Sequence, residues 1–171
     1  NNKESYTHED IIIDNDTIAY IGTNYRGEYD ELIDATDKIV MPGLINCHTH
    51  LGMSIFRATN DDYKLDKWLS EYIWPIEDNM TDEDMYYTTL LSLVEMVKTG
   101  TTCFNDMYFN WKGSLKALEK IKVRGLFGRC LMGDTDEGGI KRINEFKECY
   151  NCLDNKLIRP SIPIHGLYTI T

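Results

Sequence analysis

The sequence predicts an α/β protein built on a parallel sheet, and two observations lead to that prediction. Short apolar segments with strand character alternate with helical patterns from residue 42 onward. The connections are long enough to hold the crossover helices that parallel neighbours require. No Gly-x-Gly-x-x-Gly motif follows the first segment, which argues against a dinucleotide site. Both a doubly wound sheet and a (β/α)8 barrel fit this pattern.

Residues 1–41 predict a separate small β element. The apolar runs 10–13 and 17–22 flank an Asp-Asn-Asp cluster, and such a cluster between β-branched runs is typical of a hairpin. Residues 31–35 and 38–41 predict two further short strands. Pro-Gly then interrupts the chain, so we place a domain boundary between residues 41 and 42.

The second part predicts alternating strands and helices. Strands are expected at 44–50, 101–104, 125–132 and 162–165, an amphipathic stretch at 65–76, and helices around 115–121 and over 140–153. Thr81 and Asp84 match a capping box, so a long helix should begin there and end at Gly100. The expected buried faces are Tyr86, Leu90, Leu93, Val94 and Val97 on that helix, and Ile143, Phe146, Tyr150 and Leu153 on the last one.

Composition excludes several classes of function. The formal net charge is −10, which argues against a nucleic-acid partner because binding phosphates needs clustered Lys and Arg. No apolar run approaches the roughly 18 residues that span a membrane, and no signal peptide is visible. The five cysteines are irregularly spaced, which indicates reduced thiols. These features predict a cytoplasmic protein without a membrane partner.

His48 and His50 are the strongest candidates for metal binding. Side chains at i and i+2 of a strand point to the same face, so both imidazoles should project from the end of 44–50. A catalytic zinc usually takes three protein ligands and a water. Alone, a His-x-His motif often marks nothing. Barrel enzymes carry their active sites at the carboxyl-terminal ends of the strands. The polar residues expected at those ends are His48, His50, Asn105, Asp106, Arg129 and His165.

Residues 40–50 resemble the first barrel strand of the amidohydrolase superfamily, and they read Val-Met-Pro-Gly-Leu-Ile-Asn-Cys-His-Thr-His. The segments 68–69, 74–77 and 98–102 resemble the branch that holds 5-methylthioadenosine/S-adenosylhomocysteine deaminases and chlorohydrolases. The resemblance runs from about residue 11 to the end. It implies the N-terminal half of a metal-dependent (β/α)8 TIM-type barrel (42–171, incomplete), preceded by part of a small β-sandwich (1–41).

The resemblance also implies roles for individual residues. His48 and His50 correspond to two metal ligands, for Zn²⁺ or alternatively Fe²⁺ or Ni²⁺, with one ion per full-length subunit. Glu77 corresponds to the acid that binds ribose hydroxyls, and Trp68 to an aromatic residue that lines the pocket. Arg129 and His165 correspond to residues that contact the substrate, although the family's His-x-Pro-Tyr reads His-Gly-Leu-Tyr here. The remaining ligands and the proton-transfer residues are expected beyond Thr171.

Each of these residues has a plainer alternative. Glu77 could be a solvated charge after a helix, Trp68 a core residue and His165 a structural histidine. Arg129 is harder to explain in that way. A permanently charged guanidinium between Gly128 and Cys130 in an apolar strand needs a carboxylate or a ligand.

The activity that the resemblance implies is hydrolytic deamination of an adenine nucleoside such as S-adenosylhomocysteine or 5-methylthioadenosine. An activated water would attack the ring carbon that carries the amino group, and ammonia would leave. The alternatives are a guanine or cytosine deaminase, an s-triazine chlorohydrolase, or an inactive fragment that acts only as an interaction module. We expect a fragment of a longer enzyme that is inactive alone. Homo-oligomer formation stays open.

Overall fold

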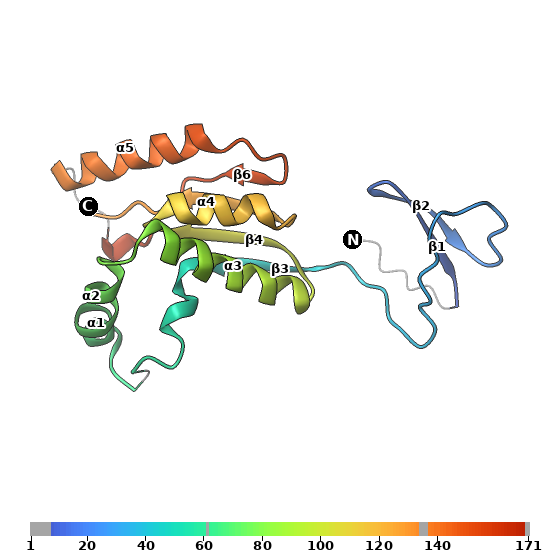
Figure 1. Ribbon diagram of the computed structural model, residues 1–171, viewed down its shortest axis with the longest axis horizontal. Helices are drawn as coiled ribbons and strands as arrows, with labels where there is room; N and C mark the ends of the chain where they lie inside the picture. Colours follow the sequence, from blue (N-terminus) through green and yellow to red (C-terminus); the bar gives the residue numbers. More distant parts are fainter. Residues whose placement is uncertain (1–7, 61, 134–136, 170–171) are drawn as a thin grey trace. The chain divides into compact units, whose positions relative to one another are not determined.

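The computed structural model describes residues 8–60, 62–133 and 137–169. The chain divides into two units, one ending at Met41 and the other beginning at Pro42. In the first unit, strands β1 (Asp10–Asp14) and β2 (Thr17–Gly22) pair antiparallel (Figure 1). The turn between them contains Asn15 at φ 55°, a conformation that Asn tolerates better than most residues. The predicted hairpin is therefore confirmed.

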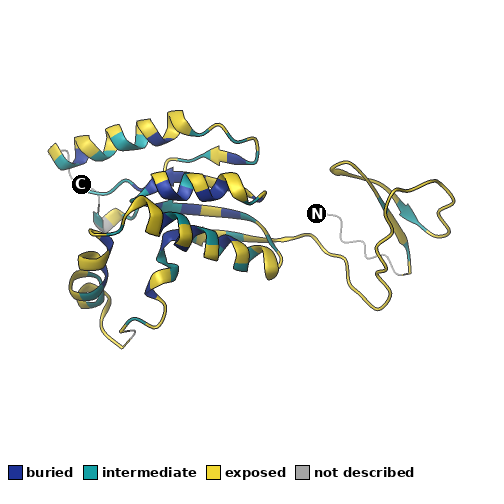
Figure 2. Ribbon diagram, viewed as in Figure 1, coloured by how far each residue is buried: buried dark blue, intermediate teal, exposed yellow. Residues whose placement is uncertain are grey.

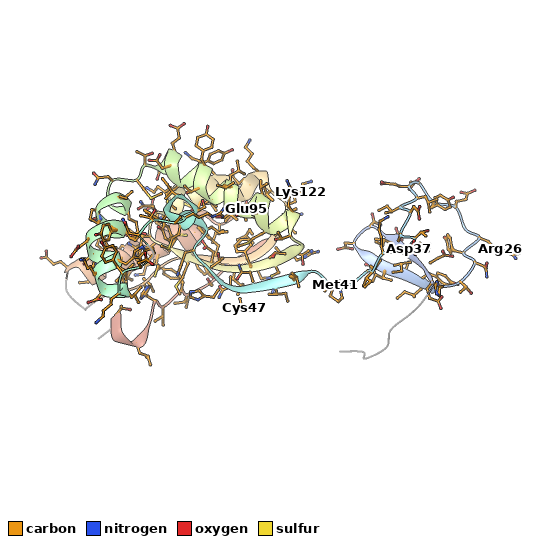
Figure 3. All side chains as sticks on the ribbon, turned by 90° about the horizontal axis from the view of Figure 1, so that it is seen from below. Arg26, Asp37, Met41, Cys47, Glu95 and Lys122 are labelled. Carbon is orange, nitrogen blue, oxygen red and sulfur yellow. The ribbon has the colours of Figure 1, made fainter. Side chains whose placement is uncertain are left out.

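Residues 31–35 and 38–41 form no strand, so that prediction was wrong. The backbone N–H of Lys38 donates to the carbonyl oxygen of Ala35, and Asp37 has φ 58°, so the chain turns here instead of extending (Figure 3). Every side chain of the two segments is exposed. A strand needs a ladder partner, and β-branched residues alone do not supply one.

The second unit holds a sheet of four parallel strands: β3 (Leu44–Thr49), β4 (Thr101–Tyr108), β5 (Arg124–Arg129) and β6 (Ile158–Pro160). Their order in the sheet is β3-β4-β5-β6, which is also their order along the chain (Figure 1). A doubly wound sheet reverses direction at a switch point, whereas the wall of a (β/α)8 barrel adds strands in sequence. The strand order therefore favours the barrel.

Strand β4 is longer than predicted. It continues to Tyr108, so Asn105 and Asp106 lie within the strand and not after it. Asn and Asp are poor strand residues in isolation, but here each is paired with a residue of β5. Tertiary pairing has overridden local propensity.

The last strand lies earlier than predicted. Strand β6 pairs with β5 over Ile158–Pro160, whereas the expected segment 162–165 contributes only an isolated bridge between Ile164 and Leu131. Pro163 lies in that segment and has no N–H to donate to a ladder. The prediction of a strand at 162–165 was therefore wrong, because the strand lies at Ile158–Pro160.

Three helices cover one face of the sheet: α3 (Asp82–Lys98), α4 (Trp111–Lys120) and α5 (Glu137–Cys152). The core between them and the strands is the largest concentration of buried residues in Figure 2. Its members are Leu51, Leu93, Phe104, Trp111, Ala117, Leu118, Val123, Phe127, Cys149 and Ile158. No described helix has the length and apolar character needed to span a membrane.

The predicted helix faces were right only in part. Leu93 is buried, and Tyr86, Leu90 and Leu153 pack against the core. Val94, Val97, Ile143 and Tyr150 are instead 41–50% exposed. Helix α3 turns Met85, Thr89 and Leu93 inward, at a spacing of four residues. Its apolar residues span a wider arc than the face that is covered.

The opposite face of the sheet is open. Ile45 and Leu126 are 67% and 40% exposed. Partners in a parallel sheet point the same way, so Asn105, which pairs with Leu126, shares this face. In a complete barrel this face would form the packed interior, and its carboxyl-terminal edge would carry the active site.

Removing the cap of α3 should destabilise the protein modestly. The Thr81 hydroxyl accepts from the Asp84 N–H, and the Asp84 carboxylate accepts from the Thr81 N–H. Thr81→Ala should lower the free energy of unfolding by about 1 kcal/mol, because an N-terminal N–H loses its partner. Urea denaturation measures this change. The exposed Ser70→Ala is the control, and an equal effect of both substitutions would contradict the prediction.

Candidate metal centre and substrate cleft

An irregularity in β3 directs the two histidines to the open face. Asn46 pairs with Phe104 of β4, which faces the helices. Thr49 is three positions further along β3, and its partner in β4 faces the helices too, because the register shifts between Asn46 and Thr49. The partner of Thr49 is Asp106, which is buried. Since partners point the same way, the neighbours of Thr49, His48 and His50, point to the open face. Regular alternation from Asn46 would have turned both imidazoles toward the helices.

The two imidazoles are adjacent, and one of them is oriented by the backbone. The ring centroids of His48 and His50 lie 4.9 Å apart, at an interplanar angle of 79°. His50 Nδ1 lies 2.7 Å from the carbonyl oxygen of Met107. A carbonyl can only accept, so Nδ1 carries the proton and Nε2 keeps its lone pair. This is the arrangement that metal-binding histidines usually show.

The protonation state of His50 also suits a ligand. Burial lowers the pKa of His50, the hydrogen bond to Met107 opposes that effect, and the nearby charges of His48 and His165 lower the pKa further. A neutral imidazole is the form that binds metal. Within the described ranges, no three His, Cys, Asp or Glu side chains are grouped closely enough to hold an ion. The His48–His50 pair is therefore a candidate for two ligands of a metal site.

His165 lies just beyond β6. Its Nδ1 is 3.1 Å from the Thr169 hydroxyl, and its backbone N–H donates to the carbonyl oxygen of Leu131 at 3.0 Å. Its influence on the pKa of His50 puts the two histidines within electrostatic reach. The structure thus brings His165 toward the His48–His50 pair.

Glu77 is buried, with 8% of its surface exposed, at the end of helix α2 (Trp74–Glu77). The Tyr108 hydroxyl donates to Glu77 Oε1. Burial raises the pKa of Glu77, and the hydrogen bond from Tyr108 opposes that rise. The alternative of a solvated surface charge is therefore excluded.

Arg129, at the end of β5, is 7% exposed and already has a carboxylate partner. Its Nε donates to Glu145 Oε2 at 2.9 Å, and its Nη2 lies 2.7 Å from the same oxygen. Its Nη1 donates to the Cys130 carbonyl, and its guanidinium lies 5.6 Å from the centroid of the Phe109 ring. Glu145 on α5 thus satisfies the buried charge.

Glu77 and Arg129 line the same open cleft, whose volume is about 650 Å³. That volume lies within the usual range for small-molecule sites. Trp68 does not line it. Trp68 ends helix α1 (Leu65–Trp68), before the π-helical turn η2 (Leu69–Ile73), and its indole N–H donates to the Thr59 carbonyl at 2.6 Å.

A match to a known protein family shows to which family these residues belong. Residues 39–171 match the profile of the Amidohydrolase family. The chain belongs to the amidohydrolase family. The His48–His50 pair at the end of β3 is thus part of an amidohydrolase barrel wall.

Two curated relatives of this amidohydrolase are adenine-nucleoside deaminases by name. The 5-methylthioadenosine/S-adenosylhomocysteine deaminase of Thermoanaerobacter pseudethanolicus is 43% identical over 93% of this chain and 38% of the relative. The 5'-deoxyadenosine deaminase of Methanocaldococcus jannaschii is 39% identical over 94% of this chain and 40% of the relative. The chain thus spans about two fifths of the length of these relatives.

Solved amidohydrolase structures share the fold. An adenosine deaminase from Xanthomonas campestris with bound zinc matches with a TM-score of 0.68 and 31% identity, over 77% of this chain and 31% of that one. A guanine deaminase from C. acetobutylicum with bound guanine matches with a TM-score of 0.74 and 17% identity, over 95% and 42%. At that identity the second match shows the fold alone.

Three buried or paired residues of this amidohydrolase have roles that the sequence patterns do not predict: Asp106, Tyr108 and Glu145. Asp106 is 1% exposed, and its Oδ1 accepts from the Leu51 N–H at 2.7 Å. Burial raises the pKa of Asp106 to about 7, against the opposing hydrogen bond from Leu51. Strict alternation from Phe104 would have placed Asp106 on the helix-covered face and so identified a buried acid.

Asp106 should make the stability of the protein depend on pH. Its folded-state pKa of about 7 lies above the unfolded value, so its contribution to stability is complete below about pH 4 and is lost as the pH rises through 7. Asp106→Asn cannot titrate and should flatten that part of the curve. Urea denaturation between pH 4 and 8, with a chelator present, measures the change. Identical slopes for both proteins would contradict the prediction.

Proposed function

We propose that this chain forms the part of a metal-dependent hydrolase that carries the His-x-His pair, and that the complete enzyme deaminates an adenine nucleoside. The observation that carries the proposal is the His48–His50 pair, with His50 Nε2 left free by the hydrogen bond of Nδ1 to Met107. The names of the two curated relatives support the choice of an adenine nucleoside, such as 5-methylthioadenosine, S-adenosylhomocysteine or 5'-deoxyadenosine.

The proposed cofactor is one divalent metal ion, with zinc preferred to Fe²⁺ or Ni²⁺. Neutral imidazole nitrogens are good zinc ligands, and the Xanthomonas campestris structure contains zinc. The ion would supply Lewis-acid chemistry, lowering the pKa of a water so that it becomes a nucleophile at neutral pH. His48 and His50 would hold it, together with ligands from outside the described residues.

The cleft residues would bind and orient the nucleoside. Glu77 Oε1 is engaged by Tyr108, which leaves Oε2 free to accept from a ribose hydroxyl. Arg129 is fixed by Glu145, and its remaining N–H groups would contact the substrate. His165 is proposed to contact the substrate near the metal. For Trp68, only the family resemblance supports a role in the pocket.

The other candidates receive less support. The guanine deaminase likeness is at 17% identity and concerns the fold alone, so it does not favour guanine as a substrate. No observation on this protein specifically favours cytosine deamination, triazine dechlorination or a role as an interaction module. A cytoplasmic location and homo-oligomer formation stay predictions.

A substrate panel tests the proposal. The full natural chain, loaded with zinc, should release ammonia from 5-methylthioadenosine, S-adenosylhomocysteine or 5'-deoxyadenosine, and should release none from guanine or cytosine. Ammonia release from guanine or cytosine, with none from the adenine nucleosides, would contradict the adenine-nucleoside assignment. If zinc binds and no substrate of the panel reacts, the deaminase proposal is wrong.

The same assay on residues 1–171 alone should give no ammonia above the uncatalysed rate. The described residues offer two histidine ligands, whereas catalytic zinc usually takes three protein ligands. Turnover by the isolated 171-residue polypeptide would contradict this expectation. A mixture with the separately expressed remainder of the natural protein, if there is one, is the positive control.

A further inference from the structure

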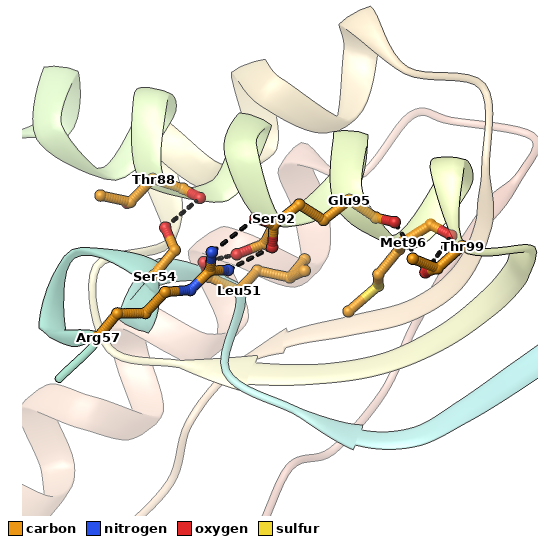
Figure 4. A network of polar contacts seen from close by, with 8 residues as sticks. All are labelled: Leu51, Ser54, Arg57, Thr88, Ser92, Glu95, Met96 and Thr99. Atoms are coloured by element: carbon orange, nitrogen blue, oxygen red, sulfur yellow. Dashed lines mark hydrogen bonds and ion pairs between the residues drawn. The ribbon is translucent and has the colours of Figure 1, made fainter. Parts of the chain in front are cut away.

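Leu51, the residue directly after His50, is held at both of its backbone groups by side chains from two other elements. Its N–H donates to Asp106 Oδ1 on β4 at 2.7 Å. Its carbonyl accepts from Ser92 Oγ on α3 at 2.8 Å (Figure 4). Leu51 is fully buried and begins the 3₁₀ helix η1 (Leu51–Phe56). The chain that leaves the metal-binding strand is thus fixed within one residue of a proposed ligand.

The two contacts act together with the bond that orients the imidazole. Asp106 holds the backbone after His50, and the next residue, Met107, accepts from His50 Nδ1. Two consecutive residues of β4 therefore fix both the ring and the chain that carries it. Asp106 is 1% exposed, so this bond is shielded from competing water.

We propose that Asp106 and Ser92 are positioning residues that hold His50 in the orientation in which its Nε2 binds the metal. The inference rests on the proposed metal site and adds residues that do not themselves touch the ion. Partners that orient a ligand commonly contribute 10–100-fold to metal affinity. Losing either bond would let the start of η1 shift and carry His50 with it.

A purely structural role is the alternative, and the same interface offers a control for it. Ser54 Oγ donates to the Thr88 carbonyl at 2.8 Å and also joins η1 to α3, three residues further from the histidine (Figure 4). Ser54→Ala and Ser92→Ala each remove one serine-to-carbonyl hydrogen bond of equal length. Only Ser92→Ala frees the residue next to His50.

The test is zinc affinity, measured by competition with a chromophoric chelator in the full natural chain. Ser92→Ala and Asp106→Ala should each weaken zinc binding by about 10–100-fold, and Ser54→Ala by less than about 2-fold. Asp106→Asn keeps an oxygen that accepts from Leu51 and should recover most of the affinity lost in Asp106→Ala. Thermal unfolding should show similar destabilisation in the two serine variants.

The outcomes separate the two proposals. If the unmodified protein binds no zinc, the proposed function fails, and this inference fails with it. If zinc binds and Ser92→Ala matches Ser54→Ala in affinity, the positioning role alone is overturned. If Asp106→Ala does not fold, the comparison of the two serine variants still decides.

Discussion

Replacing His50 with alanine in the full natural chain should lower zinc affinity by more than about 100-fold and abolish deamination. The outer partners of metal ligands already contribute 10–100-fold, so loss of a ligand itself should exceed that. His50 is the better-oriented of the two proposed ligands, because its Nδ1 is bonded to Met107 at 2.7 Å. Competition titration and ammonia release measure the two effects.

A histidine outside the site provides the control for this experiment. His8 is exposed and is not one of the proposed ligands, so His8→Ala should leave zinc affinity and activity unchanged. Tight zinc binding by the His50→Ala protein would show that the His-x-His pair is not the metal site.

Phe127→Ala should be the most destabilising single substitution among those considered. Phe127 is fully buried in the core between the sheet and its helices. Truncating a buried Phe removes apolar contacts and leaves a cavity, at a cost of about 3–5 kcal/mol. Typical domains have only about 5–15 kcal/mol of stability, so much of it would be lost. Urea denaturation measures the change.

An exposed aromatic residue provides the comparison for Phe127. Tyr87 on α3 is 59% exposed, so Tyr87→Ala should change the free energy of unfolding by less than about 1 kcal/mol. Similar losses in the two variants would mean that the helix-covered face is not the core of this unit.

The parts of the fold that depend on local pattern could be predicted from the sequence. The hairpin around Asn15, the capping box at Thr81 and the positive φ of Gly100 after α3 each have a nearby chemical cause. The parallel arrangement also followed, because helices of crossover length separate the strands. Local pattern left a barrel and a doubly wound sheet open; the family resemblance implied the barrel, and the strand order agrees with it.

The errors lie where a partner distant in the sequence decides the outcome. Residues 31–35 pair with no strand and do not form one. Asn105 and Asp106 pair with β5 and lie within β4. The site shows the same limit. The His48–His50 spacing was visible, but the register shift that turns both rings to the open face depends on pairing with β4. The Arg129–Glu145 ion pair likewise joins a strand to a later helix.

His48 and His50 are proposed to bind a divalent metal on the open face of the sheet. Anomalous diffraction at the zinc absorption edge, from crystals of the full natural chain grown with zinc, would locate that metal. We predict a zinc peak about 2.0–2.1 Å from Nε2 of His50, with an imidazole nitrogen of His48 at the same distance. A bound zinc that contacts neither histidine would contradict the claim.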